Sequence, residues 1–151
     1  MGADASGQES LHPAGWPRPA GYANGIAAQG RAIYVAGQIG WDPTTQTMVG
    51  ADFAAQADAA LANVIAVLGA GGAAPRDVVR LTWFVTDRAE YIAARRALGA
   101  AYRARFGAHY PAMSVIFVSA LLEPGAKVEI EATAVVPRVR SSEQHRGEGH
   151  A

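Results

Sequence analysis

The sequence predicts an α+β domain in which one sheet carries both of its helices on the same face. Two strand-then-helix units of similar length follow one another, and two more strands close the ordered chain. A helix or sheet must bury its apolar side, and short connections place such units together as two layers. The chain has 151 residues, of which 50% are hydrophobic, so one domain with a packed core is expected.

Charge and composition exclude several classes of protein. Lys+Arg and Asp+Glu are equal at 13 each, which argues against a nucleic-acid binder and against binding to a membrane surface. The absence of cysteine excludes disulfides, zinc–thiolate sites and thiol nucleophiles. No signal-like segment and no run of about 18 apolar residues is present, so we expect a cytoplasmic protein without a membrane partner.

The two ends of the chain are small and polar. We therefore expect disordered tails over residues 1–11 and 138–151, and a single domain over 12–137. The first stretch of this domain, residues 12–25, contains three prolines and three glycines. It is predicted to be extended or turning rather than helical.

The first strand-then-helix unit covers residues 32–72. The strand is predicted over 32–41, and Gly37 and Gly40 within it indicate a bulge or a close backbone approach. A helix is predicted over 51–72, ended by a pair of glycines. Its apolar residues recur at helical spacing: Phe53, Ala57, Ala60, Leu61, Val64 and Leu68.

The second unit covers residues 77–106. Its strand, 77–87, alternates between one face with Val79, Leu81, Trp83 and Val85 and another with Arg80, Thr82 and Phe84. Asp87 followed by Glu90 predicts a capping box that opens a helix over 88–106. The apolar stripe of this helix is Tyr91, Leu98, Tyr102 and Phe106, and its arginines Arg95, Arg96 and Arg103 are expected to be solvated.

Two final strands are predicted over 113–121 and 127–136, joined by a turn at 123–126. Two helices cannot cover both faces of the resulting sheet. The second face is expected to carry Trp83 or Phe84 and Ile116 or Phe117, and an uncovered apolar face favours a partner subunit. We therefore expect a homo-oligomer.

Most familiar site patterns are absent. The glycine run at 69–73 follows a helix instead of leading into one, which favours a helix end over a phosphate-binding loop. The four histidines lack metal-ligand spacing, and His109 is read as a loop residue rather than a pocket residue. Ser114 and Ser119 do not stand in a nucleophile elbow.

The last strand places Glu129 and Glu131 on one face, about 6.5–7 Å apart. Two interpretations are open. The glutamates can form a solvated face paired with Lys127 or a cross-strand arginine. Alternatively, a carboxylate here can position water or move a proton, above all if the face meets another subunit.

Five segments, in order, resemble the Rid family, the YjgF/YER057c/UK114 group of reactive-intermediate deaminases. They are "GYANGI", "IYVAGQIGWDPTT", "FAAQADAALANVIAVLGAGGAAPRDVVRLTWFVTD", "YPAMSVIFVSAL" and "KVEIEATAV". The resemblance implies a chorismate-mutase-like fold with a six-stranded mixed sheet backed by two helices. It further implies a homotrimer with a ligand cleft between each pair of subunits. The implied reaction is hydrolysis of 2-imino and 2-enamino acids to 2-keto acids and ammonia, without metal or organic cofactor.

The resemblance also implies the site. Glu129 stands where the family's water-positioning glutamate is found, and Tyr22 stands where its N-terminal tyrosine is found. The backbone of the cleft is implied to be Ala36, Gly37 and Gln38. Where deaminating members carry the arginine that binds the substrate carboxylate, this chain has Met113, and Val115 replaces a frequent cysteine.

Two functions therefore remain open from the sequence. One is a divergent imine or enamine hydrolase, and the other is a non-catalytic small-molecule-binding trimer. Loss of a bidentate contact to a carboxylate weakens binding on the order of 100-fold. Arg80 is a candidate replacement cation, although a surface role is favoured, and Trp41, Trp83 and Tyr110 are candidates for lining the site.

Overall fold

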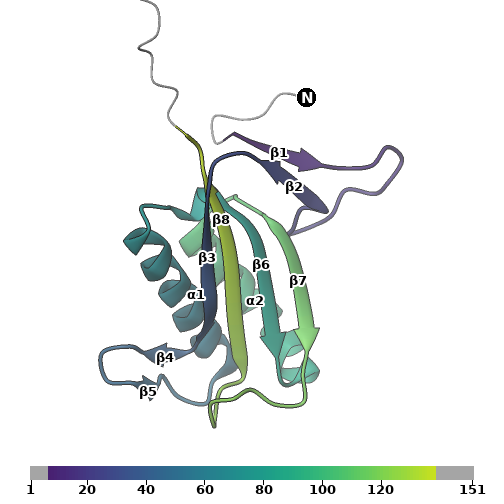
Figure 1. Cartoon of the computed structure of the whole chain (residues 1–151). Helices are drawn as coiled ribbons and strands as arrows, with labels where there is room; N and C mark the ends of the chain where they lie inside the picture. Colours follow the sequence, from purple (N-terminus) through teal and green to yellow (C-terminus); the bar gives the residue numbers. More distant parts are fainter. Residues whose placement is uncertain (1–6, 139–151) are drawn as a thin grey trace, which may run out of the picture.

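The structure, a computed structural model, describes residues 7–138. These residues form three β-sheets and two α-helices (Figure 1). The helices are α1 (Phe53–Ala70) and α2 (Arg88–Phe106), with a single 3-10 turn η1 (Pro75–Asp77) between them. The strands are β1 (Gln8–Leu11), β2 (Gly25–Ala28), β3 (Arg31–Ile39), β4 (Trp41–Asp42), β5 (Thr47–Met48), β6 (Val78–Val85), β7 (Ala112–Phe117) and β8 (Val128–Val136).

The main sheet has the order β3-β8-β6-β7. Strand β8 runs antiparallel to both β3 and β6, whereas β6 and β7 are parallel and joined by α2. Both helices lie behind this sheet in Figure 1, and the face toward the viewer carries no helix. The predicted placement of both helices on one face of a sheet is confirmed for the main sheet, whereas the prediction that all strands join a single sheet is wrong.

The expected six-stranded sheet is not found among residues 7–138, because the main sheet has four strands. Strands β1 and β2 pair with each other in a separate hairpin, as do β4 and β5. The first hairpin joins the main sheet only through a bridge between Ala23 and Ala112 at the β7 edge. The intervening segment contains three prolines, which lack the N–H that a longer ladder needs.

The N-terminal tail is shorter than predicted, since residues 8–11 form β1. Gln8 is buried and its side chain donates a hydrogen bond to the Arg76 carbonyl (2.9 Å). This contact and the pairing with β2 order a stretch whose composition alone looks unstructured. The rest of that predicted tail, residues 1–6, and the predicted C-terminal tail from residue 139 lie outside the described residues.

Helix α1 begins at Asp52, whose carboxylate accepts a hydrogen bond from the Ala55 N–H (2.9 Å). All six apolar residues predicted for its buried stripe are buried. Among the described helices it alone has the length and composition of a membrane span, but its apolar side packs against the sheet as the core. The apolar composition of α1 is therefore that of a helix packed into the core.

Strand β6 follows the predicted alternation except at its start. Leu81, Trp83 and Val85 lie on one face, as predicted, and the structure shows that this face is buried in the core. The register against β8 shifts between Val78 and Arg80, so a bulge falls at Val79. Val78, rather than Val79, is therefore the fully buried residue at this end.

Helix α2 has the predicted bounds and the predicted Asp87 cap, which accepts a hydrogen bond from the Glu90 N–H (2.8 Å). The second half of the capping box does not form. The Glu90 carboxylate instead pairs with the Lys127 ammonium at 3.0 Å. This pair joins α2 to the chain that leads into β8.

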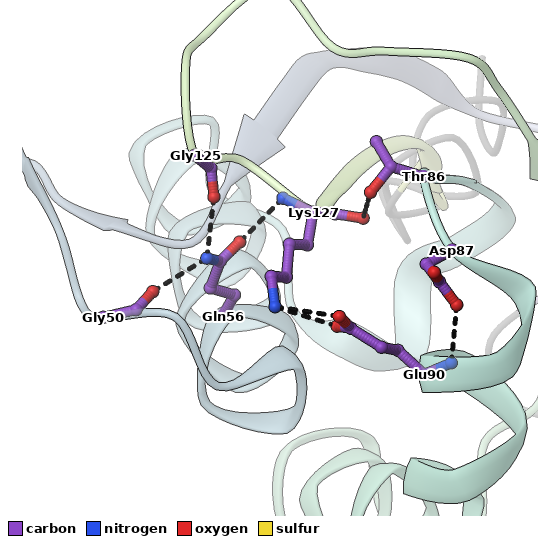
Figure 2. A network of polar contacts seen from close by, with 7 residues as sticks. All are labelled: Gly50, Gln56, Thr86, Asp87, Glu90, Gly125 and Lys127. Atoms are coloured by element: carbon purple, nitrogen blue, oxygen red, sulfur yellow. Dashed lines mark hydrogen bonds and ion pairs between the residues drawn. The ribbon is translucent and has the colours of Figure 1, made fainter.

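A buried amide fixes the start of β8 (Figure 2). The Gln56 side chain on α1 is fully buried. It donates to the carbonyls of Gly50 (2.8 Å) and Gly125 (3.0 Å) and accepts from the Lys127 N–H (2.8 Å). Because Glu129 lies two residues beyond Lys127, this network sets the position from which β8 presents it.

Candidate functional site

Strand β8 turns Glu129 toward the face of the sheet that the helices leave open. Val128 and Ile130 on either side of it are fully buried in the core, and side chains alternate along a strand. Glu131 lies on the same open face and is exposed. Among the described residues neither carboxylate takes part in an ion pair, so the predicted pairing with Lys127 or a cross-strand arginine is wrong for this chain by itself.

Glu129 stands against a bulge in the neighbouring strand β3. The register between β3 and β8 shifts between Val35 and Gln38, which confirms the irregularity predicted at Gly37. A Cβ added to Gly37 would lie 2.6 Å from Cδ and 2.7 Å from Cγ of Glu129. The carboxylate therefore occupies space that only glycine leaves free.

Ala36, Gly37, Gln38 and Glu129 are together called the Glu129 surface. The Gln38 side chain turns back to donate a hydrogen bond to the Ala36 carbonyl (3.0 Å). Ala36 itself is exposed. Four of the predicted site residues are thus neighbours on β3 and β8.

The other three predicted site residues line a cavity of about 590 Å³ on the helix side of the sheet, here called the α2 cavity. It lies between α2, strands β6 and β7, and the chain just before β2. Its lining contains Tyr22, Met113 and Val115 together with two more predicted aromatic candidates, Trp83 and Tyr110. Trp41, the remaining aromatic candidate, is not part of this lining.

Tyr22 reaches the α2 cavity because the chain beside it is tied to β7. The Ala23 N–H donates to the Pro111 carbonyl (2.9 Å), and Ala23 forms the bridge to Ala112. Ala23 is buried by these contacts. The tyrosine is therefore held beside Met113, which follows Ala112 on the same strand.

Stacked aromatic rings build one wall of the cavity. The ring of Tyr102 stacks on Phe106 (4.9 Å between centroids) and on Tyr110 (5.4 Å). Its hydroxyl donates to the His109 carbonyl (2.7 Å), and burial raises the pKa of Tyr102 well above its usual value. Tyr102 is therefore a neutral structural residue at ordinary pH.

His109 is a structural loop residue, as predicted. Its Nε2 lies 2.7 Å from the Val78 carbonyl, which can only accept, so this nitrogen carries the proton. The contact ties the loop after α2 to the start of β6. His109 does not line the α2 cavity.

The two groups of predicted site residues do not meet within one chain. Met113 packs against the helix-side core, whereas Glu129 points to the opposite face. Arg80 is exposed and sits on a strand position facing Thr133, two residues from Glu131 along β8. It does not line the α2 cavity, so it does not take the place of the missing arginine there.

Arg95 and Arg103 are exposed, as predicted, and both also line the α2 cavity. Their spacing of eight residues puts them on one face of α2, next to the apolar stripe, and this spacing was the available signal. The cavity wall also contains the Trp83 indole. Its Nε1 is buried and has no hydrogen-bond partner among the residues that the structure covers.

Residues 7–138 hold no cluster of three or more histidine, aspartate or glutamate side chains that could ligate a metal ion. Within residues 7–138, the Glu129 surface therefore offers a carboxylate without an ion-pair partner. The α2 cavity, on the opposite face of the sheet, offers aromatic rings and two arginines.

Comparison with known proteins matches residues 17–136 to the family model described as "Endoribonuclease L-PSP". The 2-iminobutanoate/2-iminopropanoate deaminase of Escherichia coli is 40% identical over 109 residues, covering 70% of this chain and 80% of the relative. The human deaminase of the same name is 33% identical over 105 residues, covering 70% and 73%. A crystal structure of the Rid-family protein YyfB from Yersinia pestis, of unknown function, superposes with a TM-score of 0.76 at 34% identity, covering 86% of this chain and 99% of that one.

Proposed function

Because this chain belongs to the Rid family (YjgF/YER057c/UK114), we propose that it hydrolyses reactive imines or enamines to a carbonyl compound and ammonia. Relatives that carry the name of an imine deaminase are 32–40% identical to it. The matched segment contains both the Glu129 surface and the α2 cavity.

The observation that carries this proposal is the position of Glu129. Its carboxylate is held over Gly37 on an open face and accepts no hydrogen bond from the residues in the described part of the chain. An ionised carboxylate with free lone pairs binds and orients water. Gly37 fixes where that water stands.

The reaction requires little else. An imine carbon is electrophilic, so a positioned water can add to it, with Glu129 taking one of the water's protons. The proton then passes to the nitrogen of the tetrahedral intermediate. Glu129 next carries the hydroxyl proton of this carbinolamine to the amino nitrogen, so the C–N bond breaks, the carbonyl forms and ammonia leaves.

The cleft in this proposal lies between two subunits of a homotrimer. The Glu129 surface and the α2 cavity are on opposite faces of one sheet, so one chain cannot bring both to the same ligand. A neighbouring copy can, if its Glu129 surface faces the α2 cavity. The exposed Tyr34 and Ile116 on or beside the open face support its being covered by another subunit.

Met113 supports a second candidate, a non-catalytic small-molecule-binding trimer. It lines the α2 cavity where deaminating relatives carry the arginine, and a thioether cannot pair with a carboxylate. Nucleic-acid cleavage, which the family description names, is disfavoured by the zero formal net charge.

The test is hydrolysis of freshly made imines. An L-amino-acid oxidase releases 2-imino acids in the presence of the protein, and keto-acid formation is followed against buffer. We expect acceleration by the wild type, loss of about 100-fold or more in Glu129→Gln, and no change in Glu131→Gln. If the wild type does not accelerate keto-acid formation from any of several amino acids, the hydrolase proposal is rejected and the small-molecule-binding trimer is favoured. Full activity in Glu129→Gln would show that Glu129 does not position the reacting water.

A further inference from the structure

We propose that Arg95 and Arg103 on α2 replace the missing strand arginine, and that the α2 cavity takes the carboxylate of an aromatic 2-imino acid. This inference rests on the proposed function, because it names the substrate class of the same cleft. The positive charge is relocated from β7, where Met113 stands, to the facing helix.

The charge of the cavity supports this assignment. Arg95 and Arg103 are the two charged residues of its lining, and no acidic residue is among the lining residues. Within the described part of the chain, the ion pairs on α2 use Arg105 with Asp58 and Glu90 with Lys127, and neither cavity arginine is engaged. The cavity therefore presents two guanidinium groups without a counter-charge, which favours a ligand with a carboxylate.

The Arg103 side chain lies along the cavity side of α2. Residues 95, 99 and 103 follow one another at helical spacing on the cavity side. At the central position Gly99 has no side chain, and Nη1 of Arg103 lies 3.2 Å from where a Cβ would be. The Arg103 side chain thus folds back over Gly99, toward the turn that carries Arg95.

The remaining walls favour an aromatic side chain on the ligand. They include five aromatic residues, Tyr22, Trp83, Tyr91, Tyr102 and Tyr110, and the apolar side chains of Met113 and Val115. A cavity of about 590 Å³ has the size of sites that take drug-sized ligands, far more than a three-carbon imino acid fills. Aromatic rings pack well against such walls.

Trp83 contributes apolar surface to the cavity. Trp83 is 4% exposed, and its Nε1 is buried with no acceptor within residues 7–138. Because this nitrogen is shielded from solvent, the indole offers a ligand a ring to pack against rather than a hydrogen-bond donor.

The test measures binding of stable keto-acid products by calorimetry. Phenylpyruvate and pyruvate are titrated into the wild type, the Arg95→Gln/Arg103→Gln double variant, and Arg96→Gln as the matched control on the same helix. We expect phenylpyruvate to bind more tightly than pyruvate, and the double variant to lose about tenfold or more in affinity. Arg96→Gln should bind like the wild type, because Arg96 is equally exposed but does not line the cavity.

Met113→Arg in the double variant is the rescue arm. It returns a guanidinium to the cavity from the strand side and should restore most of the lost affinity. Equal affinity in the wild type and the double variant would overturn the inference, as would pyruvate binding as tightly as phenylpyruvate.

Glu129→Gln separates this inference from the proposed function. Arginine-dependent binding that persists in Glu129→Gln, with no hydrolysis by any variant, supports the ligand class and rejects catalysis. Hydrolysis that depends on Glu129 but is unchanged in the double variant supports catalysis and rejects the assignment of Arg95 and Arg103.

Discussion

Gly37 determines where the Glu129 carboxylate stands. A methyl group at this position would overlap Cδ and Cγ of Glu129, so the whole carboxylate would have to swing away. Gly37→Ala should therefore reduce imine hydrolysis about tenfold or more while binding of keto acids in the α2 cavity stays within error. Keto-acid formation and calorimetry on the same preparation measure both effects.

The matched control is Gly69→Ala, in a helix and with open space around its added Cβ. This variant should hydrolyse imines at the wild-type rate. A fully active Gly37→Ala protein would mean that the reacting water is not held by Glu129 in this position.

Gln56 is the residue whose loss should be felt most in stability. Its buried amide holds two carbonyls and one N–H of the backbone around the start of β8 (Figure 2). Gln56→Leu keeps the volume but strands these groups, so the free energy of unfolding should fall by about 2–4 kcal/mol. Urea denaturation measures the change.

Thr86→Val is the control in the same network. The Thr86 hydroxyl lies 3.4 Å from the Lys127 carbonyl, which also accepts from the Thr86 N–H at 3.1 Å. A loss of less than about 1 kcal/mol is expected there. Equal losses in the two variants would contradict the central place given to Gln56.

At the scale of residues, the resemblance to the Rid family predicted that Glu129 and Met113 belong to the site. Glu129 lies on the open face of the sheet, and Met113 lines the α2 cavity. The sequence could not show that Glu129 leans on Gly37, because that contact depends on the bulge in β3. Arg103 is exposed, as predicted, but the sequence could not show that it also lines the α2 cavity, because several segments build that cavity.

At the scale of elements, one ion pair joins the two helices. Arg105 on α2 donates two hydrogen bonds to Asp58 on α1, at 2.6 Å and 2.8 Å. This hydrogen bonding holds the pKa of Asp58 below its ordinary value of 3.8. Because the folded-state pKa is the lower one, the pair adds stability above pH 3.8 and loses it as pH falls through the folded-state value.

Asp58→Asn should accordingly lower the free energy of unfolding at neutral pH by at most about 1 kcal/mol, because both side chains are partly solvated. The gap between variant and wild type should narrow as pH is lowered below 3.8. Urea denaturation across this range, with Arg105→Gln completing a double-mutant cycle, provides the measurement. A gap that is constant with pH would mean that the ion pair is not its source.

Gly99 lies inside helix α2, where a glycine lowers the stability of the helix. Gly99→Ala should raise the free energy of unfolding by up to about 1 kcal/mol. It also pushes the end of the Arg103 side chain outward, so phenylpyruvate should bind more weakly. Gly69→Ala should stabilise without changing affinity, and unchanged affinity in Gly99→Ala would contradict the position given to Arg103.

Elements with strong periodicity were predicted well from the sequence. The stripe of α2 at Leu98, Tyr102 and Phe106 is buried, and its bounds agree with the prediction. Strand β1 was missed because four mostly polar residues carry no periodic signal and are ordered by a partner strand far along the chain. The bulge at Val79 was missed for a similar reason, since it arises from pairing with β8.

At the scale of the whole molecule, the packing of two helices on one face of a sheet was predictable from the sequence. The separation of the candidate site residues onto opposite faces of that sheet was not. Alternation along β8 shows that Glu129 leaves the core, but the sequence does not say which face a ligand approaches. The α2 cavity draws on three segments, the chain before β2, helix α2 and strands β6–β7. Their joint arrangement depends on tertiary contacts such as Ala23 with Ala112.

The split makes a quantitative prediction about mixed assemblies. Glu129→Gln chains keep an intact α2 cavity, and Met113→Glu chains keep an intact Glu129 surface but repel a carboxylate. Each variant alone should be inactive as a trimer of about three times the 15.7 kDa chain mass. Light scattering on each preparation checks the assembly.

Co-assembly of the two inactive variants shows whether two subunits share each cleft, with keto-acid formation from freshly generated imines as the measurement. If each cleft combines the α2 cavity of one subunit with the Glu129 surface of the next, random mixing restores roughly a quarter of the wild-type activity. No recovery in mixed trimers, or a monomer mass for the active wild type, would contradict a cleft shared between subunits.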